Sequence, residues 1–178
     1  MIELKEGIYM DTPIRDLTYG QILEIRTEGL DPSFETGDEV KMMNVGLDLA
    51  DHILDSVYGD LDLDEEDYDE CLILATNTYK KAFEEPSQEL LKTVPKPRKL
   101  KRKEMRKLQE AGLDLRKHNH NELTAEISSA MIDHILKNIY SDTDFTDVPY
   151  SVCLYLGKET YQSSYGQGKK QGDEIKNS

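Results

Sequence analysis

The stretch "EIRTEGLD" at residues 24–31 returns in the second half of the chain as "KLQEAGLD" at residues 107–114. Both stretches end in Gly-Leu-Asp. A glycine just beyond a helix adopts the left-handed conformation of a Schellman motif, and the leucine after it supplies the hydrophobic contact that accompanies this motif. We therefore predict that the same helix occurs twice in the chain and is stopped at Gly29 and at Gly112.

Two longer blocks repeat in the same order. "DHILDSVYGD" (51–60) matches "DHILKNIYSD" (133–142) at six of ten positions, and "YDECLILATNTY" (68–79) matches "YSVCLYLGKETY" (150–161) at six of twelve. A single one-residue gap aligns all three blocks. Because self-similarity at a constant offset marks a repeated structural unit, the sequence predicts a tandem duplication.

Each unit is predicted to contain three helices, the first over 18–28 and over 101–111. Thr18 with Gln21 fits a capping box, in which the two side chains satisfy free amides at the helix start. The second and third helices carry apolar stripes at helical spacing, which is typical of one face turned toward a core. The stripes are Val45, Leu49, Ile53 and Val57, matched by Ile127, Met131, Ile135 and Ile139, and Tyr68, Cys71, Leu72, Ala75 and Tyr79, matched by Tyr150, Cys153, Leu154, Gly157 and Tyr161.

The predicted fold class is all-α, a tandem duplication of a three-helix unit. The first helical repeat unit covers 1–84 and begins with a short extended segment at 1–16. Three prolines mark residues 85–99 as a linker, and the second helical repeat unit follows at 100–162. Residues 163–178 are rich in Gly, Ser and Lys, so we expect a disordered tail there.

The charge of the chain is strongly negative and unevenly distributed. The net charge is −14, with 6 Lys+Arg and 24 Asp+Glu in residues 1–89 against 16 and 12 in residues 90–178. No run approaches the 18 apolar residues of a membrane span, and the N-terminus lacks the pattern of a signal peptide. We therefore expect a cytosolic protein with no membrane partner and with its two cysteines as thiols.

Motifs for nucleotide and metal chemistry are absent from the sequence. It contains no glycine-rich phosphate loop, no C-x-x-C pair and no H-E-x-x-H. The acidic run at 60–70 has carboxylates at EF-hand spacing, but Glu65 stands where that loop needs Gly and Cys71 where it needs Glu. The run is better interpreted as a solvated helix start, and we predict no metal and no cofactor.

The histidines and cysteines also favour a structural role. His52 and His134 each flank an apolar stripe, which is typical of a partly buried, hydrogen-bonded histidine. Cys71 and Cys153 lie within the stripes and have no nearby basic residue in sequence to lower a thiol pKa. We therefore predict no catalytic residue and a protein that is not an enzyme.

A basic run at the start of the second unit is the strongest local charge signal. Lys96 and Arg98 open it, and on the helix predicted there Leu100, Met105 and Leu108 would face inward. Three interpretations stand. In the first, the run contacts an acidic protein surface, either within one molecule or between copies. In the second it is a solvated helix face, and in the third it binds nucleic acid. The whole-chain charge disfavours nucleic acid. The predicted partner-binding residues are Lys99, Lys101, Arg102, Lys103, Arg106 and Lys107.

The entry to the first helix resembles a known family. "PIRDLTYGQILEIRTEGLDP" (13–32) is similar to the start of small bacteriophage tail assembly chaperones, with the matching positions Arg15, Leu17, Thr18, Gly20, Ile22, Gly29, Leu30 and Asp31. This resemblance implies a helper in the cytoplasm of an infected or lysogenic bacterium. Such a protein holds tape-measure or tail-tube subunits before assembly and performs no chemistry.

The leading functional hypothesis is thus a non-enzymatic protein-binding protein, with a phage tail subunit or another client as its partner. A homo-oligomer is compatible with this hypothesis. The alternative is an acidic decoy or inhibitor that mimics nucleic acid, as in phage counter-defence, and binds a basic partner. The acidic first unit favours the decoy, whereas the basic run of the second unit opposes it.

Overall fold

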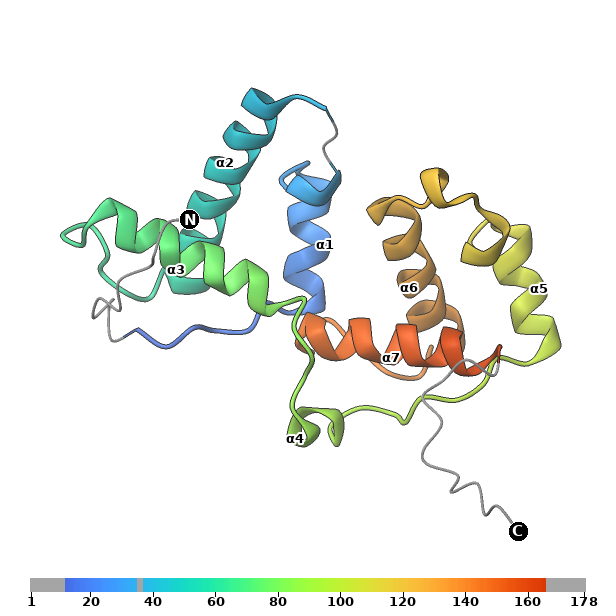
Figure 1. Ribbon diagram of the computed structural model, residues 1–178. Helices are drawn as coiled ribbons and strands as arrows, with labels where there is room; N and C mark the ends of the chain where they lie inside the picture. Colours follow the sequence, from blue (N-terminus) through green and yellow to red (C-terminus); the bar gives the residue numbers. More distant parts are fainter. Residues whose placement is uncertain (1–11, 35–36, 166–178) are drawn as a thin grey trace, which may run out of the picture. The chain divides into compact units, whose positions relative to one another are not determined.

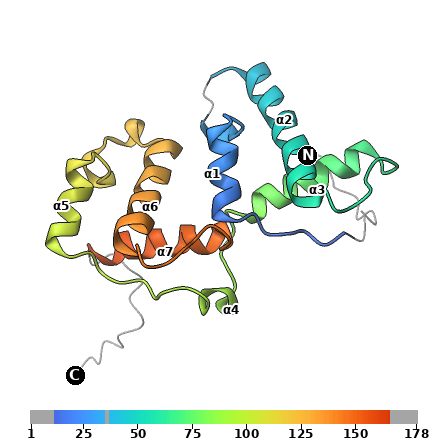
Figure 2. The ribbon, with the colours of Figure 1, turned by 180° about the vertical axis from the view of Figure 1, so that it is seen from behind.

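The structure is a computed structural model of the 178-residue chain that describes residues 12–34 and 37–165. All regular elements in these ranges are helices and no β-strand is present in them, which confirms the all-α class. The chain divides into two compact units, residues 1–84 and residues 85–178. Each unit is described separately below (Figures 1 and 2).

In the first unit the second and third long helices pack against each other. The short 3-10 helix that follows the first long helix also contacts the second long helix. In chain order the elements are α1 (Tyr19–Thr27), η1 (Pro32–Phe34), α2 (Glu39–Tyr58) and α3 (Tyr68–Lys81).

In the second unit the last two long helices likewise pack together, and the first long helix of this unit packs on the second, whereas in the first unit the 3-10 helix makes the additional contact. Gly157 in the last helix permits the close approach, since an added Cβ would lie 2.8 Å from the Cδ1 of Ile132. The elements are α4 (Gln88–Leu91), α5 (Arg102–Glu110), η2 (Leu115–Lys117), η3 (His120–Glu122), α6 (Ala125–Ile139) and α7 (Tyr150–Ser163).

The predicted ends of the first helix of each unit are confirmed. Thr18 and Gln21 form the capping box of α1. Gly29 and Gly112 have φ angles of 71° and 73°, in the left-handed region. The amide of Leu30 donates to the Ile25 carbonyl at 2.9 Å, and Leu113 repeats this bond to Leu108 at 3.0 Å. These are the bonds of a Schellman motif, so both helices stop in the same way.

The predicted apolar stripes are mostly buried or half-buried, and one of their residues is exposed. In both units the middle of the second helix is buried, and so is the cysteine of the third helix. The exposed residue is Tyr68, at 62% exposure, although its counterpart Tyr150 is buried. In the second unit Phe145 is buried in the loop before α7, whereas the matching loop of the first unit is acidic and exposed. The tyrosine at this position of the repeat is therefore exposed in the first unit and buried in the second.

Corresponding residues of the two units make the same hydrogen bonds. The Tyr58 hydroxyl lies 2.7 Å from Thr78 Oγ1 and accepts from the Arg15 amide at 2.9 Å. Tyr140 lies 2.7 Å from Thr160 Oγ1 and accepts from the Arg98 amide at 3.1 Å. Each tyrosine thus ties the end of the second helix to the third helix and to the segment before the first one. The duplication stays a prediction from sequence, and these paired contacts are what a duplicated unit would show.

The predicted linker and tail differ in part from the structure. The short helix α4 lies inside the linker, with the Ser87 hydroxyl accepting from the Leu90 amide at its start. The tail was predicted from residue 163, but Ser163 ends α7 and Tyr165 contacts Asp114, because these side chains find partners in the second unit. Residues 12–17 form no helix or strand. Residues 1–11 and 166–178 of the predicted terminal segments lie outside the described residues.

Candidate functional site

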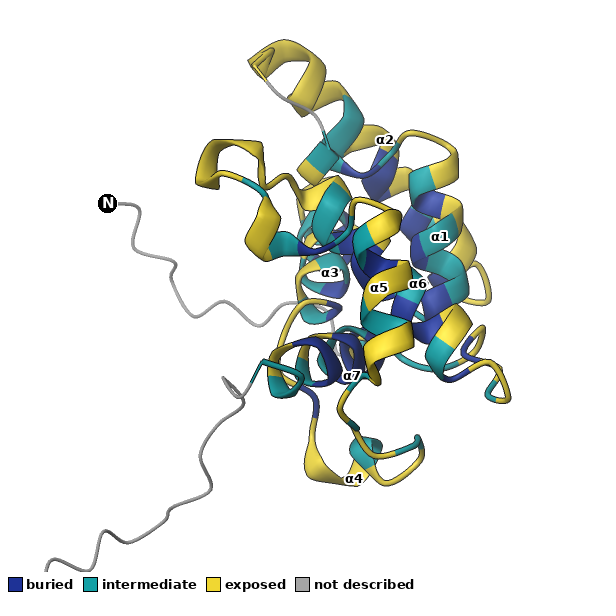
Figure 3. Cartoon of the chain, turned by 90° about the vertical axis from the view of Figure 1, so that its right-hand side faces the viewer, coloured by how far each residue is buried: buried dark blue, intermediate teal, exposed yellow. Residues whose placement is uncertain are grey.

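The first half of α2 carries an exposed apolar face. Val40 and Met43 are 65% and 61% exposed, and Met42 and Leu47 are exposed as well. The carboxylate of Asp38 starts the helix by accepting hydrogen bonds from two amides of its first turn, at 3.1 Å each. The first turns of α2 accordingly stand out as exposed in Figure 3. At about 100° per residue Val40, Met43 and Leu47 lie on one side of the helix, whereas Met42 lies on another. Clusters of exposed apolar side chains mark protein-binding surfaces, and we call Val40, Met43 and Leu47 the apolar face of α2.

The corresponding part of the second unit lacks this face. In the alignment of the two repeats Met43 matches Ala125, the first residue of α6, and Leu47 matches Ser129. Helix α2 therefore begins before the position at which α6 begins, and its added turn holds Val40 and Met42. Corresponding apolar residues form the core of each unit, but only the first unit carries the apolar face. This face is therefore a separate property of the first unit.

An acidic pocket of about 570 Å³ lies at the other end of α2. Asp51 and Asp55 of α2 contribute carboxylates, and Asp64 and Glu66 add two more from the loop before α3. These four carboxylates form no ion pair with the residues that the structure describes. The remaining residues of the pocket are Leu54, Tyr58, Gly59, Leu61, Leu63, Tyr68 and Cys71.

The predicted basic partner-binding residues lie on and just before α5. All six of them are exposed, and none forms an ion pair within 12–34 and 37–165. Arg98 of the same run is different, because its guanidinium binds both oxygens of Glu104 at 2.9 and 2.7 Å. That pairing lowers the pKa of Glu104 to about 2. The free basic surface therefore comprises Lys99, Lys101, Arg102, Lys103, Arg106 and Lys107.

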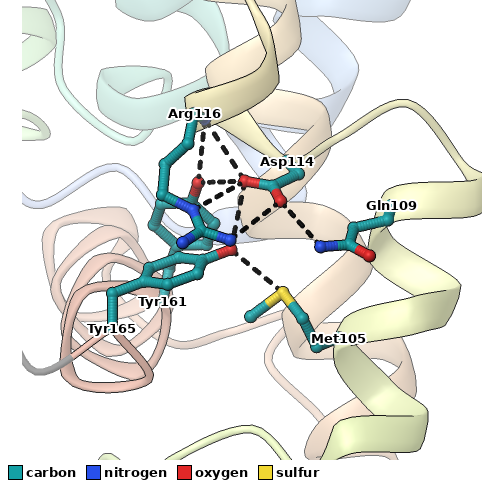
Figure 4. A network of polar contacts seen from close by, with 6 residues as sticks. All are labelled: Met105, Gln109, Asp114, Arg116, Tyr161 and Tyr165. Atoms are coloured by element: carbon teal, nitrogen blue, oxygen red, sulfur yellow. Dashed lines mark hydrogen bonds and ion pairs between the residues drawn. The ribbon is translucent and has the colours of Figure 1, made fainter.

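A buried aspartate is the centre of the most extensive polar network (Figure 4). Asp114 accepts hydrogen bonds from Tyr161 at 2.9 Å, Tyr165 at 3.0 Å and Gln109 at 3.0 Å. Arg116 adds two side-chain contacts at 3.2 Å each. Burial by itself would raise the pKa of Asp114, but these donors lower it well below its usual range. The network therefore holds a charged carboxylate and joins α5, η2 and α7.

The first unit has the same centre with other partners. Asp31 accepts from Tyr79 at 2.7 Å, from Arg26 at 3.0 Å and from the amide of Ser33 at 3.0 Å. Burial again opposes the charged form, and the hydrogen bonds from Ser33, Tyr79 and Arg26 lower the pKa of Asp31. Because both carboxylates are buried and are held by donors of their own unit, we interpret both networks as structural.

The two cysteines are unsuited to nucleophilic catalysis. Burial, and then the charge of Asp133, raise the pKa of Cys153 to about 12. Burial and the charge of Glu66 also raise the pKa of Cys71. A thiol is a weak nucleophile and the thiolate is the reactive form, so both side chains act as apolar core residues. Both are buried free thiols.

Metal-ligand clusters and membrane-spanning helices are both absent from the residues described. No group of three or more His, Cys, Asp or Glu side chains there is arranged to hold a metal ion. None of the helices described is both long enough and apolar enough to cross a membrane.

The burial of His134 is expected to make the stability of the second unit depend on pH. Burial, and then the charge of Lys107, lower the pKa of His134 from its ordinary value of 6.5. Its Nε2 is buried with no hydrogen-bond partner among the described residues. Below pH 6.5 the unfolded chain binds a proton here that the folded chain does not, so the free energy of unfolding is expected to fall as the pH drops. Urea denaturation of the wild type and His134→Gln between pH 7.5 and 5.0 tests this.

The matched control for that experiment is His120→Gln, which changes an exposed histidine of the same unit. It should keep the wild-type decline, whereas His134→Gln should flatten it. Equal declines in all three proteins would show that burial of His134 is not the cause.

Sequence reasoning found the basic surface but missed the apolar face of α2. The signal was present, because Val40, Met43 and Leu47 are spaced as three, then four residues along one helix side. Spacing alone does not distinguish a core stripe from a binding face, since both have the same period.

No protein-family model matches the chain, and neither a curated protein nor a solved structure matches it.

Proposed function

We propose that the protein is a non-enzymatic protein-binding protein that holds an amphipathic helix of a client on the apolar face of α2. The observation that carries the proposal is the exposure of Val40, Met43 and Leu47 along one side of a helix in a unit whose repeat partner lacks these side chains. A helix that lays its apolar side into such a surface is a common mode of protein recognition. Methionine is well suited to it, because its flexible side chain adapts to different partners.

The specific role that we propose is that of a phage tail assembly chaperone, with a tape-measure or tail-tube subunit as its client. Its support is the resemblance of residues 13–32 to the helix entry of that family, together with a client-binding face in the same unit. A net charge of −14 favours a soluble complex while the client is held. The cytoplasm of the bacterial host is the compartment that this role requires.

A second candidate, an acidic decoy of nucleic acid, is favoured by one observation. Residues 1–84 hold 22 Asp+Glu against 6 Lys+Arg. The two functions differ in how binding responds to salt, because attraction between exposed charges is screened and apolar burial is not. A decoy would lose its basic partner steeply between 50 and 500 mM salt, whereas a client held by the apolar face would stay bound.

The proposed function is tested by giving α2 the residues of its repeat partner. In the double variant Met43→Ala, Leu47→Ser, binding of a labelled, net-neutral amphipathic helix peptide should weaken by at least about tenfold, because two apolar contacts are lost. Fluorescence anisotropy with the full-length chain measures this. Thermal unfolding should change little, since both side chains are exposed.

The matched control is Leu123→Ser, which removes an exposed apolar side chain from the second unit. It should leave peptide binding unchanged. If the wild type does not bind the peptide, or if the control weakens binding as much as the double variant does, the apolar face of α2 is not the client site.

A further inference from the structure

We propose that the client helix carries a lysine or arginine one to two turns beyond its apolar residues, and that this side chain enters the acidic pocket at the C-terminal end of α2. This inference rests on the proposed function, because it names the chemistry of the client that the apolar face would hold. The occupant is a basic amphipathic helix.

The apolar face and the pocket are continuous along one side of α2. At about 100° per residue, Val40, Met43 and Leu47 point in nearly the same direction as Leu54, which lines the pocket. From Val40 to Leu54 the helix rises by about 21 Å, at roughly 1.5 Å per residue. A client helix of four turns that lies along this side would thus reach both sites.

The pocket has the chemistry that a long basic side chain needs. Its carboxylates from Asp51, Asp55 and Asp64 are without ion pairs among the described residues. Leu54 and Tyr68 supply apolar surface for an alkyl stem. Lysine and arginine bury their stems on apolar surface while the cation stays near polar groups, and an exposed tyrosine ring also attracts a cation.

Tyr58, the last residue of α2, and Gly59 after it line the pocket. The carbonyls at this helix end already have donors, since the Arg15 guanidinium donates to the Val57 carbonyl and the Leu61 amide donates to the Tyr58 carbonyl at 2.8 Å. The preference for a cation therefore rests on the carboxylate side chains of the pocket.

The second unit lacks this pocket, because buried apolar side chains and a lysine stand at the matching positions. Lys137 stands where the first unit has Asp55. Phe145 and Tyr150 are buried, whereas their counterparts Leu63 and Tyr68 are half-buried and exposed. The acidic pocket and the apolar face thus occur together on one unit, as a composite binding site would require.

Three synthetic 18-residue helical peptides test the inference on the full-length chain. They share one leucine stripe and differ at two positions beyond it, which hold lysine, glutamine or glutamate. By fluorescence anisotropy in 50 mM salt, the lysine peptide should bind about fivefold tighter than the glutamine peptide, because each partly exposed charge pair contributes modestly. The glutamate peptide should bind more weakly than both. In 500 mM salt the three affinities should converge.

Charge-neutralising variants of α2 test whether the preference for the lysine peptide comes from the pocket. Asp51→Asn and Asp55→Asn should each reduce the preference for lysine over glutamine. Asp48→Asn is the matched control, because it removes the same charge from the same helix at an exposed residue outside the pocket. An equal loss of preference in all three variants would overturn the inference, since the general field of the unit would then be the cause.

The outcomes separate the inference from the proposed function. If lysine and glutamine peptides bind equally and Met43→Ala, Leu47→Ser still weakens both, the client site stands and the pocket has no part in it. If no peptide binds, the proposed function fails. If sedimentation shows concentration-dependent self-association that blocks peptide binding, a second copy of the chain is the occupant, and the inference is wrong.

Discussion

The Ile135→Asp variant is expected to lose the folded second unit. Ile135 is fully buried in α6, at 0% exposure. The change removes a core side chain and places a carboxylate among apolar neighbours, where it has no partner. Loss of the burial alone costs about 2–5 kcal/mol, and an unpaired buried charge adds several more. This total is comparable to the whole stability of a small domain, roughly 5–15 kcal/mol.

Circular dichroism during thermal unfolding measures this loss, and Ile53→Asp provides the same test in the first unit, where Ile53 is 1% exposed. Ala130→Asp and Ser56→Asp are the matched controls, because they add the same carboxylate at exposed positions of α6 and α2. Both controls should melt close to the wild type, since exposed substitutions usually change stability little. Wild-type melting of either isoleucine variant would show that its stripe does not face the core.

The Asp114→Asn variant is expected to lower the free energy of unfolding by about 3 kcal/mol. The amide keeps the size of the carboxylate but carries no charge, and its NH2 group faces donors such as Arg116 and Gln109. Charge-assisted hydrogen bonds contribute about 1.5–3 kcal/mol each, and a buried donor without an acceptor costs a further 1–3 kcal/mol. Chemical denaturation at pH 7 measures the change.

The pH dependence provides a second readout for Asp114. Its hydrogen bonds lower the pKa of the folded carboxyl, so its stabilising contribution is fully present above the ordinary pKa of 3.8 and is lost as the pH falls below it. The difference between the wild type and Asp114→Asn should therefore shrink in acid. A difference that stays constant from pH 7 to pH 3 would contradict the charged state that we infer for the carboxyl.

Asp142→Asn is the matched control for this experiment, because Asp142 is an exposed carboxylate of the same unit. Its effect should stay within about 0.5 kcal/mol, as for most surface substitutions. Tyr165→Phe removes one donor and leaves the carboxylate in place, so its cost should be near 1 kcal/mol. If Tyr165→Phe costs as much stability as Asp114→Asn, the tyrosine and not the aspartate is the main contributor to the network.

The helix ends and the core stripes were predictable because their causes are local. A glycine at a helix end is selected by the backbone conformation of that residue, and Thr18 needs only an amide three residues away. An apolar stripe likewise follows from the 3.6-residue period within one helix. The basic surface on α5 was predictable for the same reason, since charge is a property of the residues themselves.

The buried aspartates show where this kind of reasoning ends. Asp31 and Asp114 were expected only as the last residue of a helix stop, and their partners Tyr79 and Tyr161 lie in the third helix of each unit. No local pattern connects residues so far apart in sequence. The burial of a carboxylate depends on donors that the fold brings to it.

The sequence by itself determined the long helices of this protein, the ends of the first long helix of each unit and most of the buried sides, because these depend on the conformational preferences and the spacing of neighbouring residues. Tertiary structure alone decided which apolar and polar side chains stay open to a partner. Met43 and Leu47 have the spacing of core residues, and Tyr68 is the same residue type as the buried Tyr150. Their exposure depends on whether another part of the chain covers them, which is a matter of packing in three dimensions.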